Sequence, residues 1–135
     1  MKKIALLALL LCLCGCSSSQ KKEAEGTYTN TKGETTTALV KWDGDKIKEV
    51  EIDETTGDTT KKKEGANYNM IVASSIGKEW NEQVAFLENY IKSNGTEKIE
   101  LNDEGKATNE DIMTGCTISI DGFLKAIDDA KAKAE

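Results

Sequence analysis

Hydrophobic positions between residues 75 and 93 recur every three or four residues, which predicts an amphipathic helix. Ser74 or Ser75 is expected to cap its first turn, and Asn94-Gly95 is expected to end it. The apolar stripe of this helix consists of Ile76, Trp80, Val84, Leu87 and Ile91. We expect the stripe to pack on a sheet; the alternative is that Trp80 faces a planar ligand instead of the core.

A shorter apolar stripe near the C-terminal end predicts a last helix, with Asp121 as its cap. Its members are Phe123, Leu124, Ile127 and Ala130. The first part of the chain instead alternates apolar and polar residues, which is typical of strands, and Asp43-Gly44 is a hairpin signal. The expected strands cover about residues 26–30, 35–42, 46–53, 97–101 and 116–120. These elements predict a single α+β domain, a small antiparallel sheet with two packed helices.

The segment 55–69 is polar and interrupted by glycine, so we expect a loop there. It contains three consecutive lysines, at positions 61–63. They have two interpretations: a solvated face, or a small patch that attracts anions.

The first fifteen residues have the order of a bacterial lipoprotein signal peptide. A charged "MKK" precedes the short apolar run "IALLALLLCL", and Leu13-Cys14-Gly15-Cys16 resembles a lipobox. We expect cleavage after residue 15, lipidation of Cys16, and attachment to a membrane on its extracytoplasmic side, at the cell surface or the periplasmic face. Residues 16–25 would then form a flexible tether, and residues 26–135 the folded domain. Ordinary secretion with a chance cysteine cluster is the alternative.

Composition removes several function classes. The 135 residues include 18 lysines and arginines, 24 acidic residues and no histidine, for a net charge of −6. An acidic chain lacks the basic face of a nucleic-acid-binding protein. Without histidine, Cys/His zinc sites and Ser-His-Asp catalysis are excluded, and we expect no metal site. Of four cysteines, Cys116 alone would stay a free thiol in the mature chain.

The segment "DIMTGCTIS" (111–119) has chemistry that suits a phosphate. Gly115 permits a tight turn and close approach of a ligand. Thr114, Thr117 and Ser119 offer hydroxyl groups, and the helix that follows is expected to direct its positive end to the same place. From the residues alone, two interpretations stay open: a phosphate or cofactor site, and a structural turn.

The segment resembles the motif of the FMN-binding domain family, which includes the C subunit of the sodium-pumping NADH:quinone oxidoreductase and the G subunit of the Rnf complex. The family motif is Asp, two variable positions, Ser or Thr, Gly, Ala and Thr. It stands here as Asp111-Ile112-Met113-Thr114-Gly115-Cys116-Thr117. "GTYT", "VKWDGDKIKEVEID" and "TISIDGFLKAIDDA" also look like this family, so the resemblance covers about residues 26–134. Cys116 departs from the usual Ala.

The resemblance implies a role for each residue of the motif. Thr117 would carry FMN through a phosphoester bond, installed from FAD by a separate flavin transferase. Gly115 and Cys116 would supply backbone near the phosphate, and Thr114 and Ser119 hydroxyl contacts. Asp111 would order the turn or be read by the transferase. Cys116 is expected to be a packed small residue; a redox partner is the alternative.

The expected function is that of a membrane-anchored flavoprotein, an electron carrier rather than an enzyme that turns over a substrate. Its partners would be the membrane, the transferase, a membrane electron donor and an external acceptor. One alternative is a surface lipoprotein that binds FMN non-covalently or binds another small ligand. Another is that the cleaved signal fragment acts as a signalling peptide.

Overall fold

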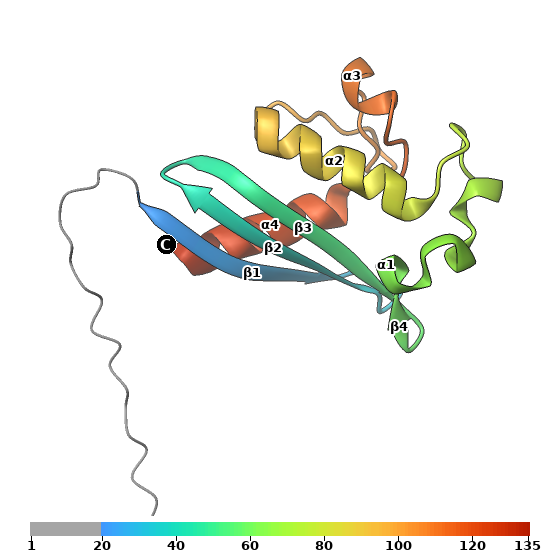
Figure 1. Cartoon of the computed structure of the whole chain (residues 1–135), viewed down its shortest axis with the longest axis horizontal. Helices are drawn as coiled ribbons and strands as arrows, with labels where there is room; N and C mark the ends of the chain where they lie inside the picture. The colour runs from blue at the N-terminus through green and yellow to red at the C-terminus, as the bar shows by residue number, and fades with distance from the viewer. Residues whose placement is uncertain (1–19) are drawn as a thin grey trace, which may run out of the picture.

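A four-stranded antiparallel sheet in the order β1-β2-β3-β4 forms the scaffold of the domain. The structure is a computed structural model that describes residues 20–135 (Figure 1). The strands are β1 (Lys21–Thr29), β2 (Thr35–Asp43), β3 (Lys46–Thr56) and the short β4 (Thr59–Thr60). The helices are α1 (Lys61–Glu64), α2 (Trp80–Asn94), α3 (Glu110–Met113) and α4 (Asp121–Ala134), with the 3-10 turns η1 (Gly65–Tyr68) and η2 (Met70–Val72). The predicted α+β class is confirmed.

The core lies on one face of the sheet. Every second residue of β2 is buried, and Ala38 and Val40 pair in register with Ile52 and Val50 of β3, so these side chains share that face. Helix α4 packs on β1 and β2, and α2 packs on β3 (Figure 1). Between the helices, the rings of Trp80 and Phe123 meet edge to face, with centroids 5.9 Å apart.

Helix α2 also closes the open side of β3. Strand β4 pairs only with the last residues of β3, so the backbone of β3 is otherwise free on that side. The N–H of Ile52 donates a hydrogen bond of 2.7 Å to the Glu88 carboxylate of α2. A side chain therefore satisfies an edge donor that would otherwise be available for pairing with another chain. No helix within residues 20–135 is long and apolar enough to cross a membrane.

Helix α2 begins at Trp80, so the predicted start near residue 75 is wrong. Ser74 does not cap the helix; its Oγ instead accepts hydrogen bonds from the N–H groups of Ile76 and Lys78 and so closes a turn. Gly77 has φ +65°, which cannot continue a helix. The N–H of Glu79 is satisfied by the Glu82 carboxylate, which makes Glu79 the cap.

The strands predicted at 97–101 and 116–120 are also wrong, because both regions form only the isolated bridges Leu101–Ala107 and Lys106–Ser119. The backbone N–H groups of 116–120 are bonded elsewhere: that of Thr117 to a side chain of α2, and that of Ile120 to the carbonyl of Gly105. β-Branched residues favour strands only where a partner strand is available. Asp121 is the first residue of α4, and the cap is Ile120.

The predicted tether is wrong for residues 21–25, which belong to β1 and pair in continuous register with Leu39–Asp43. Their polar composition suits an edge strand that faces solvent. The predicted loop 55–69 contains the end of β3, β4, α1 and η1. The predicted signal peptide and Cys16 lie outside the described residues.

Candidate functional site

A cavity of about 460 Å³ opens beside Thr117. It lies between the β1–β2 turn, the segment 70–75, and the segment 117–119 that leads into α4. Volumes of 300 to 1,000 Å³ are typical of small-molecule sites. The lining residues are Asn30, Lys32, Glu34, Glu54, Lys61, Met70, Ala73, Ser74, Ser75, Trp80, Lys106, Thr117, Ile118, Ser119 and Phe123.

Thr117 is held at the cavity by contacts to two other segments. Its backbone N–H donates to Oε1 of Gln83 at 2.9 Å, and the Oγ atoms of Thr117 and Ser75 are 3.0 Å apart. The side chain of Thr117 is half-buried, so its hydroxyl is fixed in place and still reachable. A fixed, reachable hydroxyl is what a group-transfer reaction requires of an acceptor.

Gln83 connects the three segments around this hydroxyl. Its side chain is fully buried, and its Nε2 donates to Ser74 Oγ at 3.2 Å and to the Lys78 carbonyl at 3.1 Å. Its Oε1 accepts from Thr117, so one amide group joins α2, the 74–78 turn and the motif. Sequence reasoning missed this role, because a glutamine here looks like a polar interruption of the helical stripe.

Replacing Gln83 with leucine should both destabilise the domain and slow any modification of Thr117. The buried N–H of Thr117 would lose its acceptor, which costs about 1–3 kcal/mol. Urea denaturation measures the first effect, and the initial rate of flavin labelling measures the second. The matched control is Asn89→Leu on the exposed side of α2. Equal labelling rates for the two variants would contradict a positioning role for Gln83.

Gly115 and Cys116 form the buried support of the motif. A Cβ at position 115 would lie 2.2 Å from the ring of Phe86 on α2, so only glycine allows this contact. Cys116 is completely buried and does not line the cavity. Desolvation raises the pKa of its thiol to about 11. This environment matches the packed small residue expected from the sequence.

The Cys116 thiol should be inert in the folded protein. At pH 8 a pKa of about 11 leaves roughly a hundredfold less thiolate than the ordinary value does. A disulfide reagent should therefore label the native domain at least a hundredfold more slowly than the domain in denaturant. Because the folded pKa is raised, the thiol's contribution to stability should be constant below about pH 8.5 and fall as pH rises toward 11. Fast labelling of the native state would contradict the burial.

The remaining predicted site residues separate into two groups. Ser119 lines the cavity, and its Oγ lies 3.0 Å from both the Glu104 carbonyl and Asp121 Oδ1. Thr114 is exposed, lies outside the cavity, and donates its hydroxyl to the carbonyl of Asp111 at 2.8 Å. The Asp111 carboxylate is exposed and faces Tyr90, whose phenol pKa is raised by desolvation and then by Asp111. Thr114 and Asp111 thus shape the turn.

The positive end of α4 is already occupied by the protein's own carboxylate. Partial burial raises the pKa of Asp121, but the hydrogen bonds from Ser119, Lys125 and the backbone of Gly122, with the charge of Lys125, together lower it more, so the net pKa lies below its ordinary value. The expected role of this helix end in binding phosphate is therefore not supported by the geometry. Lys106 lines the cavity together with Thr117 and Ser119, and its ammonium is paired with Glu104 at 3.2 Å.

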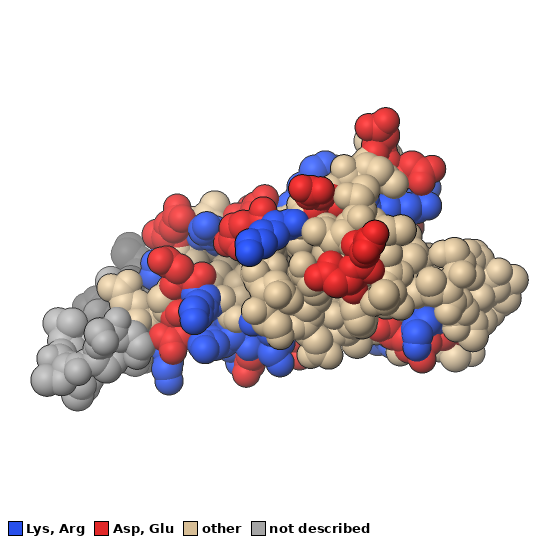
Figure 2. Space-filling view, turned by 90° about the horizontal axis from the view of Figure 1, so that it is seen from above, with Lys and Arg blue, Asp and Glu red and all other residues tan. Residues whose placement is uncertain are grey.

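Part of the cavity lining is apolar. Trp80 and Phe123 come from the core, with Trp80 only 2% exposed, and Met70 and Ile118 extend the same wall. The neighbouring segment 65–77 contains no charged residue. In Figure 2 the end of the molecule that carries this segment is almost free of charge, whereas the opposite end is densely charged. Ile71 and Val72 are exposed there.

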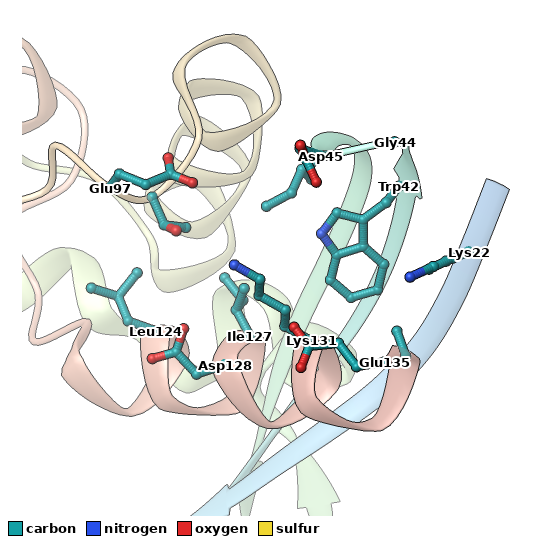
Figure 3. A pocket seen from close by; sticks show the side chains of 13 residues that line it. Lys22, Trp42, Gly44, Asp45, Glu97, Leu124, Ile127, Asp128, Lys131 and Glu135 are labelled. Carbon is teal, nitrogen blue, oxygen red and sulfur yellow. The ribbon is translucent and has the colours of Figure 1, made fainter. Parts of the chain in front are cut away.

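A second cavity, of about 560 Å³, lies at the far end of α4, near the β2–β3 turn (Figure 3). It shares no residue with the cavity at Thr117. Four carboxylates and two lysines line it, together with Trp42 and Ile127. The excess of negative charge disfavours a phosphate. Of these two cavities, the one at Thr117 is the more favourable for an anionic ligand.

The fold and site define a small α+β domain that presents one fixed threonine hydroxyl at an aromatic cavity flanked by lysines. The family model of the FMN-binding domain matches residues 32–132, so the chain belongs to the FMN-binding domain family. That membership supports FMN as the cofactor. The cavity fits this assignment, because lysines, the Thr117 hydroxyl and two aromatic residues of the core line it.

A solution NMR structure of a protein from Clostridium thermocellum has the same fold. It matches with a TM-score of 0.50 and 17% sequence identity, over 88% of this chain and 94% of that one. At this identity the similarity concerns the fold alone. A comparison with curated proteins gave no match.

Proposed function

We propose that the protein carries FMN covalently on Thr117 and relays electrons outside the cytoplasm. The main support is the position of the Thr117 hydroxyl, fixed by Ser75 and Gln83 at the opening of the aromatic cavity. When bound, FMN supplies the redox chemistry. The protein holds the flavin in position and provides the charges around it.

Attachment would proceed on the surface of a separate flavin transferase with FAD as the donor. The Thr117 oxygen attacks the flavin-side phosphorus of FAD and forms the new P–O bond. The bond between that phosphorus and the bridging oxygen breaks, AMP leaves, and the hydroxyl proton passes to a base of the transferase. On the acceptor side, Gln83 and Ser75 orient the oxygen, and Lys106 offsets the charge of the phosphate.

The proposed cellular place rests on the sequence. A signal peptide over residues 1–15 and lipidation of Cys16 would anchor the chain to a membrane on its extracytoplasmic side. A covalent bond to the flavin then has a physical purpose, since a dissociated cofactor would diffuse away. The proposed partners are a membrane electron donor and an external acceptor. The end of the molecule that carries segment 65–77 is suited to contacts with them, because few charges must be desolvated on the face shown in Figure 2.

The direct test is co-expression of residues 17–135 with a flavin transferase. We expect a fluorescent band on a denaturing gel and a mass increase equal to FMN less one water. The control is the same expression without the transferase, which should give neither. A domain that stays unlabelled while a known acceptor is labelled in the same cells would contradict the covalent attachment.

The alternative is a surface lipoprotein that binds FMN, or another small ligand, without a covalent bond. The observation that favours it is that the Thr117 hydroxyl already has a partner in Ser75. Yellow colour that co-purifies with the native domain and leaves it on denaturation would support this alternative.

A further inference from the structure

Lys61 is the one buried charged residue of the described part of the chain, with 6% exposure. Its ammonium forms an ion pair with Glu54 Oε1, and Glu54 Oε2 accepts a hydrogen bond of 2.7 Å from Thr36 Oγ1. Neither interpretation of the lysine run anticipated this, since both place all three lysines in solvent. Burying an ion pair costs desolvation energy that its mutual attraction often only balances. Stability alone is therefore a weak reason for a charged pair here.

The pair lies in the wall of the cavity beside Thr117. Both Glu54 and Lys61 line it, and the Lys61 ammonium lies 5.0 Å from the ring centre of Tyr68 and 5.6 Å from that of Trp80. The bond to Glu54 uses one of the three protons of the ammonium group. The Tyr68 side chain is a second hydrogen-bond partner, which leaves one proton for a carbonyl or ring nitrogen of a ligand in the cavity.

The ammonium stays charged at neutral pH. Burial lowers the pKa of Lys61, but the hydrogen bonds and charges of Glu54 and Tyr68 together raise it more, and the net pKa lies above its ordinary value. The cavity wall therefore holds an ammonium that stays charged and is paired with Glu54, in a site that is partly shielded from water. Charges act more strongly in such a place than on an exposed surface.

We propose that the Lys61–Glu54 pair sets the reduction potential of the flavin, with the Lys61 ammonium directed at the ring. This inference rests on the proposed function. Two electrons from the membrane donor and one proton from solvent convert the neutral ring into a ring with one negative charge. An ammonium beside that ring favours the reduced form, and a carboxylate left without its partner disfavours it.

The test is a redox titration of the covalently loaded protein, followed by absorbance. Lys61→Met should reduce the ratio of reduced to oxidised flavin at least tenfold at a fixed solution potential, about 30 mV for a two-electron couple. Glu54→Gln should change the ratio in the opposite direction, and Lys61→Arg should keep it near wild type. The matched control is Lys62→Met, which removes the neighbouring charge of α1, paired with Glu88 outside the cavity.

Opposite shifts for Lys61→Met and Glu54→Gln, with little change for Lys62→Met, would support the proposal. If Lys61→Met does not fold, Glu54→Gln still tests the proposal. An unchanged ratio of reduced to oxidised flavin in that variant would overturn the proposal. Equal shifts for Lys61→Met and Lys62→Met would also overturn it, since general surface charge would then explain both. Absence of flavin on the wild-type chain, by contrast, would contradict the proposed function itself.

Discussion

Replacing Thr117 with valine is expected to abolish covalent flavin attachment and leave the fold intact. Valine has nearly the same shape as threonine but offers no oxygen for the phosphoester bond. The backbone N–H of residue 117 would still donate to Gln83, so the turn keeps its main support. The substitution removes only the hydrogen bonds of the hydroxyl, chiefly the one to Ser75, which is worth about 1 kcal/mol. Labelling with the transferase, read by in-gel fluorescence and mass, measures the effect.

Two control variants separate the chemistry from the fold. Thr117→Ser keeps an oxygen at the same place and should still be labelled. Thr108→Val removes an exposed hydroxyl outside the cavity, where Thr108 donates to the Glu100 carbonyl, and should be labelled like the wild type. Full labelling of the valine variant would show that the phosphoester is on another residue. Ser119 would then be the next to test, because it lines the same cavity.

The local pattern of the chain was enough to predict the elements that depend on their own residues. The alternation around Val40 predicts the buried face of β2, and the stripe around Leu87 predicts the buried face of α2. In each case the residues of the element alone determine which face is buried. The errors arose where a distant group decided the outcome. The segment 116–120 has strand-forming residues, yet its N–H at Thr117 bonds to Gln83, 34 positions earlier, and no partner strand lies beside it in the described part of the chain.

Some residues of the candidate site could likewise be predicted from the local sequence, and others could not. Thr117 and Gly115 belong to one short motif, so a family resemblance could identify them. The residues that complete the site come from separate parts of the chain. Lys61 of α1 and Lys106 of the loop before α3 line the cavity, and Gln83 of α2 holds Thr117. Each has a commonplace local context, and Lys61 is hidden in a run of three lysines. Only the fold shows that they belong to one site.

Replacing Gly26 with alanine should be the most destabilising small substitution that we propose in the domain. Gly26 of β1 faces α4, where the strand and the helix backbone are in direct contact. A Cβ at this position would lie 1.9 Å from the carbonyl oxygen of Ala126 and 2.3 Å from the backbone nitrogen of Ala130. Backbone atoms cannot rotate away as a side chain does, so α4 must shift from the sheet. Overpacking costs 1–3 kcal/mol, and this case should reach about 3 kcal/mol or more.

The comparison with Gly33→Ala isolates the cause of this loss. Gly33 has φ +83°, and a Cβ added there would have no atom within 4 Å, so alanine meets conformational strain without a clash. That strain costs about 1 kcal/mol. Urea midpoints at constant m-value should therefore fall much further for Gly26→Ala than for Gly33→Ala. Because α4 continues directly from the segment that carries Thr117, the Gly26 variant should also lose flavin labelling. Equal midpoints for the two variants would mean that α4 is not seated on β1 as the structure has it.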